Sequence, residues 1–308
     1  MANLKDIKTR ILSVQNTKKI TRAMKMVAAA KVKRAETTVK SARPFAEELM
    51  VIFRRMLSAV NGEYSLENLH VKKAIDNYAV LLEKREIKSV GLVVMTSNKG
   101  LAGAYNANII RRTLSMVDEY NEKGIAVKLF VVGQKGISGL KRKIANKNCE
   151  ILKTYLSVAN NVTSTGALLI AEDLADYFVD NKIDKIEVLT TRFKNMMSYS
   201  VQNWEVLPLS PEIEENDGKG GIDPLMLFEP NVHGILQSLV PMFITNIIYQ
   251  ALLEAQASEL ASRMTAMSAA SNNAEEMIRL LSIDYNKARQ WAITQELVEI
   301  VSGANALK

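Results

Sequence analysis

The sequence predicts a mixed fold in which a doubly wound α/β domain is inserted between two long terminal helices. Three observations favour this fold. Residues 242–302 and residues 2–43 contain neither Gly nor Pro, so each stretch can form one long helix. Between them, short apolar runs alternate with helix-like segments, which is typical of a sheet covered by helices. We expect the two terminal helices to pair as a long antiparallel coiled coil, because neither is stable without a partner.

The composition matches that of ordinary globular proteins. Apolar residues make up 48% of the 308 residues and charged residues 24%, as in average soluble domains. No apolar run approaches the length of about eighteen residues that a membrane span requires. Residues 1–9 lack the apolar core of a signal peptide and the acid-poor character of an organelle presequence. These features indicate a bacterial cytoplasmic setting.

Metal and disulfide chemistry are not expected. Cys149 is the one cysteine, which excludes an internal disulfide and a cysteine metal cluster. The two histidines, His70 and His233, lie in unrelated contexts and form no zinc motif. We therefore expect no bound metal and no cofactor.

The N-terminal helix is expected to cover residues 1–61, with Asn3 as its cap and the stop at Asn61 and Gly62. Pro44 falls inside this segment, so we expect a bend there. Apolar residues recur at spacings of three and four, which predicts a seam for a partner helix. The first of them are Leu4, Ile7, Ile11 and Val14.

Positive charge is concentrated on this first helix. Residues 1–43 carry twelve Lys and Arg against two acidic residues, whereas the whole chain has a net charge of +7. A solvated helix face, contacts with nucleic-acid phosphates, or an acidic protein surface would each account for the charge. Apolar residues interleaved through 21–30 argue against simple phosphate binding, because they make that part of the helix apolar nearly all round.

The α/β domain is expected at residues 89–208, after a mixed and charged connection at 62–88. Residues 90–96 are continuously apolar, as in a strand buried on both faces. The alternation that follows predicts a small Rossmann-like, doubly wound parallel sheet with helices on both sides. The expected strands are 90–96, 127–132, 150–154, 186–191 and an edge strand at 198–207 that ends at Pro208, and the expected helices are 107–121, 133–143 and 163–179.

Residues 209–241 are expected to form a surface loop, acidic and then Gly-rich at 211–221, followed by a short helix up to Pro241. The C-terminal helix is expected at 242–308, and its uninterrupted part would be roughly 90 Å long at 1.5 Å per residue. Its apolar positions again recur at spacings of three and four, with Ser271 as the polar interruption. They are Leu253, Ala257, Leu260, Met264, Met267, Ala274, Ile278, Leu281, Tyr285, Ala288 and Ala292.

No catalytic constellation stands out in the α/β domain. The loop after its first strand holds two glycines, Gly100 and Gly103, where a dinucleotide fingerprint needs three. Gly133, Gly136 and Gly139 precede Lys141, but their spacing does not fit a phosphate-binding loop, so tight turns explain them better. Asp173 and Asp176 share a helix face, which a solvated surface accounts for.

Three functions are compatible with this pattern. The first is a non-catalytic chain that transmits position or force through its long helices. The second is a nucleotide-binding α/β enzyme with a coiled-coil appendage, which rests on Gly100 and Gly103. The third is a nucleic-acid-binding coiled coil, which is disfavoured because aromatic stacking residues are missing among the basic positions.

Specific motifs favour the first function. They are IKTRILSVQNTKKITRAMKMVAAAKVKRA at 7–35, TSNKGLAGAYN at 96–106 and ARQWAITQELVEIVSGANA at 288–306, together with LFEP at 227–230 and YQALLEAQASELASRMTAM at 249–267. In these stretches the chain resembles the gamma subunit of bacterial F-type ATP synthases. Two positions depart from the family pattern, because Asn98 and Lys25 stand where the family often has an acidic residue. The cysteine-bearing regulatory insert of the chloroplast form is missing.

The resemblance implies the central-stalk rotor of the enzyme, which is not itself catalytic. Ion (proton) flow through the membrane c-ring would turn the shaft inside the alpha/beta catalytic ring and so couple ion transport to ATP synthesis or hydrolysis. The implied partners are the alpha, beta and epsilon subunits and the c-ring, with no nucleic acid. The implied location is peripheral, on the cytoplasmic face of the bacterial plasma (inner) membrane.

The resemblance also implies contact residues, grouped here by expected role. The apolar coil or its bearing would include Met24, Val27, Ala292, Ile293, Leu297 and Ile300. Residues expected to face an acidic lever segment of beta are Lys18, Lys19, Arg22, Lys25, Lys31, Lys33 and Arg34. Polar contacts to the catalytic ring would come from Arg263, Thr294, Gln295 and Glu296. Alanines at 28–30, 266, 269 and 270 would ease rotation in a sleeve or allow close packing of the two helices.

Overall fold

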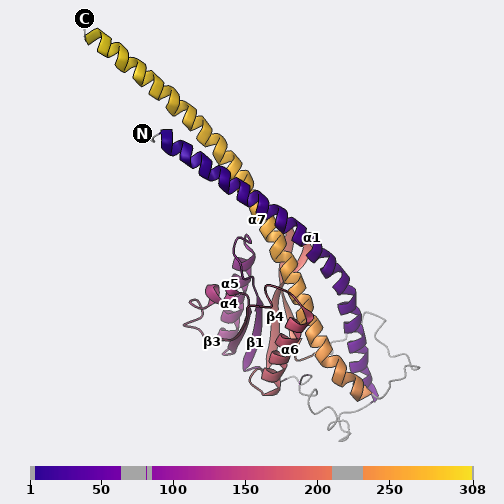
Figure 1. The fold of residues 1–308 in the computed structure, drawn as a ribbon. Helices are drawn as coiled ribbons and strands as arrows, with labels where there is room; N and C mark the ends of the chain where they lie inside the picture. Colours follow the sequence, from indigo (N-terminus) through magenta and orange to yellow (C-terminus); the bar gives the residue numbers. More distant parts are fainter. Residues whose placement is uncertain (1–3, 64–80, 82–84, 210–231, 307–308) are drawn as a thin grey trace. The chain divides into compact units, whose positions relative to one another are not determined.

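A computed structural model describes residues 4–63, 81, 85–209 and 232–306 of the chain (Figure 1). Internal contacts divide the chain into two units, one made of residues 1–30 and 263–308 and the other of residues 31–262. The expected cap at Asn3, most of the connection 62–88, the loop at 211–221 and the LFEP stretch lie outside the described residues. Each unit is described below by itself.

Two helices account for the ends of the chain, as the Gly- and Pro-free stretches predict. Helix α1 spans Leu4–Glu63, so it runs through Pro44 and through the stop expected at Asn61 and Gly62. Helix α7 spans Val232–Ala306. The predicted start of α7 at Met242 is wrong, because Pro241 lies inside the helix. Leu239 and Val240 are buried in the core just before this proline. Their packing outweighs the lost backbone hydrogen bond that a proline imposes.

The second unit contains a five-stranded sheet in the order β3-β2-β1-β4-β5. The strands are β1 (Ser89–Met95), β2 (Ala126–Val132), β3 (Cys149–Tyr155), β4 (Lys185–Asn195) and β5 (Ser198–Leu207). β1 to β4 pair in parallel, and β5 pairs antiparallel with β4 at the edge. All five strands predicted from the sequence are confirmed, and the sheet is mixed because β5 returns through a tight hairpin.

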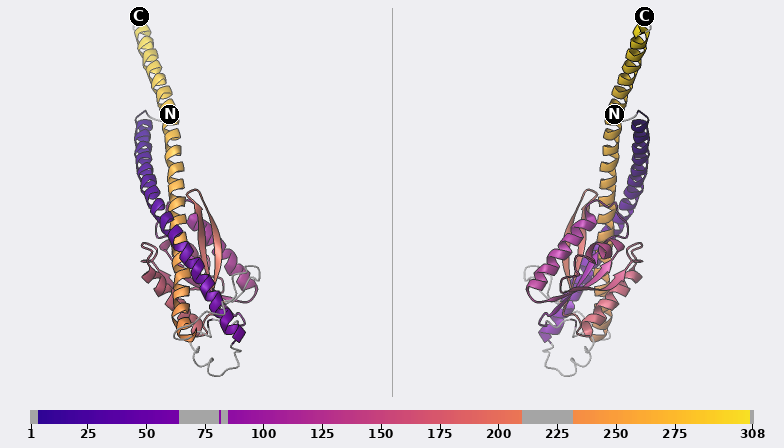
Figure 2. Two further views of the ribbon diagram at one scale, coloured as in Figure 1. Left: turned by 90° about the vertical axis from the view of Figure 1, so that its right-hand side faces the viewer. Right: turned by 90° about the vertical axis from the view of Figure 1, so that its left-hand side faces the viewer.

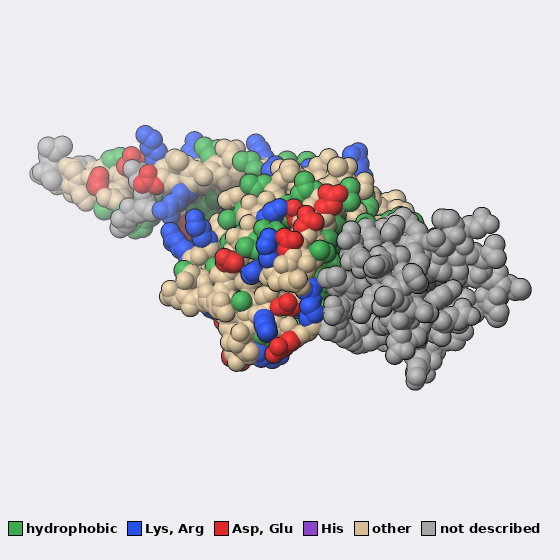
Figure 3. All heavy atoms as spheres, turned by 90° about the horizontal axis from the view of Figure 1, so that it is seen from below, with side chains coloured by type: hydrophobic (Ala, Val, Ile, Leu, Met, Phe, Trp, Pro, Cys, Tyr) green, Lys and Arg blue, Asp and Glu red, His purple; other side chains and the backbone are tan. Residues whose placement is uncertain are grey.

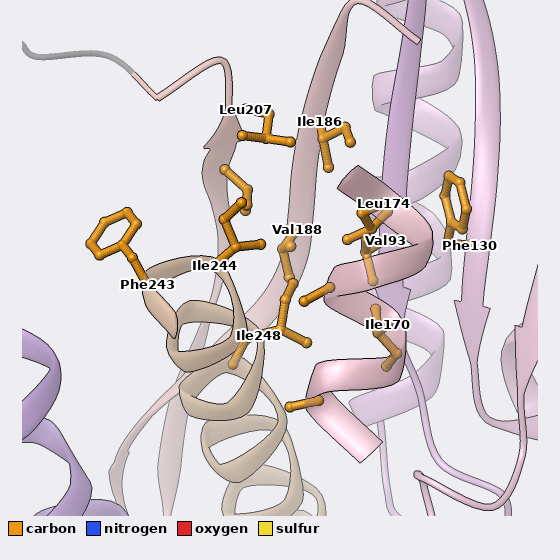
Figure 4. Packing of buried hydrophobic residues seen from close by; sticks show 14 of the residues in the cluster. Val93, Phe130, Ile170, Leu174, Ile186, Val188, Leu207, Phe243, Ile244 and Ile248 are labelled. Carbon is orange, nitrogen blue, oxygen red and sulfur yellow. The ribbon is translucent and has the colours of Figure 1, made fainter. Parts of the chain in front are cut away.

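Helices cover both faces of this sheet. α4 (Tyr105–Glu122) and α5 (Gln134–Leu140) bury Ile109 and Leu140 against one face, beside Leu92 and Leu129 of the strands. α6 (Ser164–Val179) and the first part of α7 pack on the other face. Figure 4 shows that core, with side chains of α6, α7 and the strands pointing toward one another. The labelled residues are Val93, Phe130, Ile170, Leu174, Ile186, Val188, Leu207, Phe243, Ile244 and Ile248.

Helices α1 and α7 also meet within the second unit. Val32, Val39, Leu253 and Ala257 are buried together, and Phe193 of β4 belongs to the same cluster. The predicted seam of α7 is confirmed as a face, because none of its predicted members from Leu253 to Ala292 is exposed. Small residues such as Ala257 let the two helix backbones approach closely.

The first unit consists of the free ends of the same two helices, which run side by side (Figures 1 and 2). Ile7 and Ala28 of α1 are buried, and so are Met267 and Ala274 of α7. An ion pair joins Lys18 Nζ to Glu275 Oε1 at 3.1 Å, so these two positions lie side by side on the two helices. Because both partners are partly exposed, this pair contributes little to stability.

Candidate partner-binding surface

Among the described residues, no helix lies beside the end of α7. Counting fourteen residues back from Lys18 reaches Leu4, the first described residue of α1, and the same count forward from Glu275 reaches Arg289. α7 continues to Ala306, so its last turns extend past the described start of α1. Residues 293–303 are all exposed as a consequence.

This unpaired end is strongly apolar. Ile300 is 67% exposed, and comparable exposure is found for its apolar neighbours from residue 291 onward. Soluble monomers rarely expose contiguous apolar surface of this kind, so it indicates a partner that covers it. The exposed apolar residues here are Trp291, Ile293, Leu297, Val298, Ile300 and Val301.

The apolar surface also continues along the outer sides of both helices in this unit. Val27 is 57% exposed, although Ala28 beside it is buried in the seam. The sequence predicts one apolar seam per helix, and these residues lie off that seam. They are Leu12, Ile20, Met26 and Val27 on α1 and Met277, Leu280 and Ile283 on α7.

Most of the contact residues inferred from sequence are accessible. Lys25, Val27, Ile293 and Leu297 are exposed, as are residues 294–296 and Ile300. Met24, Arg263 and Ala292 are only partly exposed. Trp291, Met26 and Ile20 did not figure among the inferred contacts. Their signal was available, because each is an apolar residue that interrupts the polar side of a helix.

Two basic candidates belong to the second unit. Lys31 and Arg34 are exposed on α1, and neither makes an ion pair with any other described residue. Lys25 in the first unit is likewise exposed and without an ion pair among the described residues. Unpaired, solvated cations of this kind can attract an acidic partner without first breaking an internal contact.

The described face that Figure 3 shows carries charges of both signs. On the described surface seen from below, Lys and Arg side chains lie beside Asp and Glu side chains (Figure 3). Examples from the sheet-containing unit are the pairs Lys153 with Asp173 and Lys185 with Glu205. A nucleic-acid interface would instead need a basic stripe or patch.

The edge of the sheet where a doubly wound domain usually binds a ligand is already occupied by the chain itself. The first three backbone N–H groups of α5, at this edge, could in principle bind a phosphate. All three are bonded to the segment that follows β1. The pairs are Gln134 N to Asn98 Oδ1 at 2.9 Å, Lys135 N to Ser97 O at 3.0 Å and Gly136 N to Thr96 Oγ1 at 2.8 Å.

The glycines of this region make room for that segment rather than for a ligand. Gly133 has φ 94°, and a Cβ there would lie 2.3 Å from the carbonyl oxygen of Thr96. A Cβ on Gly136 would lie 2.6 Å from Thr96 Oγ1. The prediction of a tight turn is therefore confirmed for Gly133, whereas it is wrong for Gly136 and Gly139, which lie inside α5. The first backbone N–H groups of α5 are not available to a nucleotide phosphate.

Other candidate groups are structural too. Asp173 accepts hydrogen bonds from Lys153 Nζ at 2.6 Å and Tyr155 Oη at 2.7 Å, so the prediction of a merely solvated side chain is wrong for this residue. These bonds tie α6 to β3. Burial raises the pKa of the Cys149 thiol to about 12, which makes it a poor nucleophile at neutral pH.

The described residues indicate neither a metal site nor a membrane-spanning helix. They contain no cluster of three His, Cys, Asp or Glu side chains suited to a metal ion. Among the same residues, none of the helices is long and apolar enough to cross a membrane.

The fold and this surface define a class of protein: a sheet domain with two long helices, one of which ends in an exposed apolar segment. The family profile described as ATP synthase matches residues 3–307. The ATP synthase gamma chain of Synechococcus sp. (strain JA-3-3Ab) is 42% identical over the full length of both chains, and that of Synechocystis sp. (strain ATCC 27184 / PCC 6803 / Kazusa) is 39% identical over the full length of both. The chain therefore belongs to the ATP synthase gamma-chain family.

Solved structures agree with this assignment. A chain in the central stalk and c-ring structure of the Tetrahymena thermophila mitochondrial ATP synthase has 27% identity and a TM-score of 0.56, over 82% of this chain and 99% of that one. A chain in the Euglena gracilis mitochondrial ATP synthase has the same fold at 18% identity, with a TM-score of 0.64 over 99% of this chain and 94% of that one.

Proposed function

We propose that this chain is the non-catalytic central-stalk rotor of an F-type ATP synthase. In this role it passes rotation between a membrane c-ring and an alpha/beta catalytic ring, and so couples ion flow to ATP synthesis or hydrolysis. Family membership supports the rotor assignment directly. The observation that carries the mechanism is the apolar end of α7, which has no partner helix within the described chain.

The apolar end suits a bearing inside a ring of partner subunits. Apolar contacts are non-directional, so a shaft can turn against them without breaking oriented hydrogen bonds at each step. Leu297 and Ile300 present such a surface, and the polar side chains of Thr294, Gln295 and Glu296 lie exposed among them. We assign the bearing to Met24, Val27 and residues 291–301.

The exposed basic side chains of α1 are suited to bind acidic segments of the catalytic ring. Lys25, Lys31 and Arg34 are exposed and unpaired among the described residues, and they would meet acidic segments of the beta subunits. Such contacts can differ from one rotational position to the next. A differential contact of this kind is what a shaft needs in order to shift the catalytic sites among their states.

We extend the same proposal to the coiled coil, the inserted domain, the segment boundaries and the location of the chain. The paired ends of α1 and α7 act as an antiparallel coiled coil, which supplies stiffness, and residues 89–208 form a Rossmann-like, doubly wound insert that carries no cofactor. The functional segments are the helix 1–61, the connection 62–88, the insert, the connection 209–241 and the helix 242–308. The epsilon subunit is a further partner, and the location is peripheral at the cytoplasmic face of a bacterial inner membrane.

Co-expression with the alpha and beta subunits tests this function. We expect the chain to co-purify with them as one complex, and to hydrolyse no ATP when it is isolated. A matched comparison replaces Leu297 and Ile300 by Asp in one variant. In the other it replaces Asn286 by Asp and Gln290 by Glu, two exposed polar residues of α7 that lie before the bearing. The first variant should bind the ring less tightly and the second should not. ATP hydrolysis by the isolated chain, or no association with the ring, would contradict the proposal.

A further inference from the structure

A buried carboxylate joins three elements of the second unit. The side chain of Glu254, on α7, is 0% exposed. Its two oxygens accept hydrogen bonds from Arg43 of α1, at 2.8 Å from Nε and 3.0 Å from Nη2. One oxygen also accepts from the backbone N–H of Phe193 in β4 at 2.7 Å. Helix α1, helix α7 and the sheet therefore meet at one ion pair.

The junction is completed from both sides. Arg43 Nη2 donates to the carbonyl oxygen of Phe193 at 2.7 Å, and Gln250 Nε2 donates to Glu254 Oε1 at 3.1 Å. Arg192 lies further away, with its Nε 3.6 Å from the same oxygen. The planar guanidinium group of Arg43 thus contacts both α7 and β4. Because its N–H donors are held in one plane, these bonds fix the relative orientation of the two elements as well as the distance between them.

Stability alone does not explain this ion pair. Burying two charges costs so much desolvation that an apolar replacement of similar volume is often as stable or more stable. The neighbouring α1–α7 contact is in fact apolar, through Val39, Leu253 and Ala257. An ion pair in this place therefore supplies something that the apolar seam does not, and oriented bonding is what distinguishes it.

Two further hydrogen bonds join α7 to β4 and to the loop after β1. Thr190 Oγ1 donates to the carbonyl oxygen of Ala251 at 2.9 Å, one turn before Glu254. Two turns after Glu254, Ser262 Oγ donates to the carbonyl oxygen of Ala102 at 2.7 Å, in the loop after β1. Apolar surfaces resist separation but allow one helix to roll on another, whereas these directional bonds oppose rotation of α7 about its own axis.

We propose that the junction of Arg43, Glu254 and the Phe193 backbone is a torque clamp, which makes both helices turn together with the sheet domain. This inference rests on the rotor function. It assigns to three residues the positioning role of transferring rotation between the sheet and the shaft helices. Without the clamp, part of each rotation would be lost as roll of α7 against β4.

The most direct test removes the charges of Arg43 and Glu254 and keeps side chains of similar volume at both positions. In the double variant Arg43→Met with Glu254→Gln, no charge of the pair stays buried, and the Gln amide can still bond the Phe193 backbone. The variant is assembled into the complete enzyme with its own partner subunits. A probe on an introduced Lys123→Cys, in a Cys149→Ser background, then reports the angle of the sheet domain.

We expect the angular variance of this probe at rest to rise about twofold or more, because the bidentate contact that fixed the angle is gone. Ion pumping driven by ATP should fall while ATP hydrolysis continues. The Tm should move by less than about 3 °C, because the replaced pair contributed little net stability.

Two controls separate a clamp from a general loss of stability. Val117→Ala shrinks a fully buried side chain of α4 on the other face of the sheet, and it should lower the Tm without raising the angular variance. Glu275→Gln removes the exposed ion pair with Lys18 and should change neither quantity. If the double variant has the same angular variance as wild type, and the same ratio of ion pumping to ATP hydrolysis, the clamp proposal is wrong. The rotor function would not be affected by that result. Failure of every variant, and of wild type, to enter the complex would instead refute the rotor function.

Discussion

At the scale of single residues, Asn98 shows how a departure from the family pattern is accommodated. Its Nδ2 donates to the carbonyl oxygen of Leu156 at 2.7 Å and to Asn160 Oδ1 at 2.8 Å, while its Oδ1 accepts from Gln134 N. A carboxylate in the same place could accept the third bond but could donate neither of the others. The amide therefore fits the local partners that this chain provides.

Restoring the acidic residue should consequently weaken the loop. We expect Asn98→Asp to lower the free energy of unfolding by about 1 kcal/mol, because two donated bonds are lost and a carboxylate then faces the Leu156 carbonyl. A favourable charge at the start of α5 offsets part of this loss. Chemical denaturation followed by circular dichroism measures it. Lys99→Gln, at the exposed neighbouring position, is the control, and an Asn98→Asp variant more stable than wild type would show that the two donated bonds do not matter.

Residue patterns alone could not have identified these contacts. Asn98 and Asn160 are 62 positions apart, and Arg43 and Glu254 are 211 apart, so only the folded chain brings each pair together. Sequence spacing likewise placed Asp173 on a helix face but could not reveal Lys153 and its hydrogen bond. Long-range polar contacts leave no periodic signal, unlike an apolar seam.

At the scale of elements, prediction from the sequence succeeded where an apolar pattern repeats. The strands and the α7 seam were predicted because burial on a strand or a helix imposes a regular spacing. The start of α7 was not, because Pro241 is a local stop signal that tertiary packing of Leu239 and Val240 overrides. Some outer apolar side chains of the two helices, such as Met26 and Trp291, were missed for a related reason, since they lie off the regular apolar seam and are about half exposed or more.

The turn between β2 and α5 is the element junction with the least room. Gly133→Ala would place a Cβ 2.3 Å from the Thr96 carbonyl oxygen, at φ 94°. We expect a loss of about 3 kcal/mol or more in the free energy of unfolding, because strain and a steric clash add. Thermal unfolding measures this loss. Gly124→Ala is the matched control, since φ is also positive there but no atom lies within 4 Å, so only the smaller backbone strain remains. Equal losses in the two variants would exclude the clash.

At the scale of the whole molecule, stability and function are carried by different residues. The buried clusters of the second unit hold the sheet and its helices together. Residues 293–303 are exposed and contribute no buried apolar side chain to either unit. Evolution of a free-standing helix would not retain such a surface, because apolar side chains in water favour aggregation. The end of α7 can therefore be altered with little effect on folding. Any change in the activity of the assembled enzyme after such an alteration then reports on the bearing role.

Removal of residues 294–308 is the corresponding test. We expect the Tm of the isolated chain to stay within about 2 °C of wild type, because no buried apolar contact is lost. In the assembled enzyme in sealed vesicles, ATP synthesis driven by an ion gradient should fall by about half or more, since part of the apolar bearing is gone. Activity should not vanish, because Met26, Val27 and Trp291 remain to contact the ring. The polar variant Asn286→Asp with Gln290→Glu leaves residues 291–301 unchanged and should synthesise ATP at the wild-type rate. Unchanged coupled synthesis after truncation would remove the bearing role from this end of α7 and assign it to the remaining apolar side chains of the two helices.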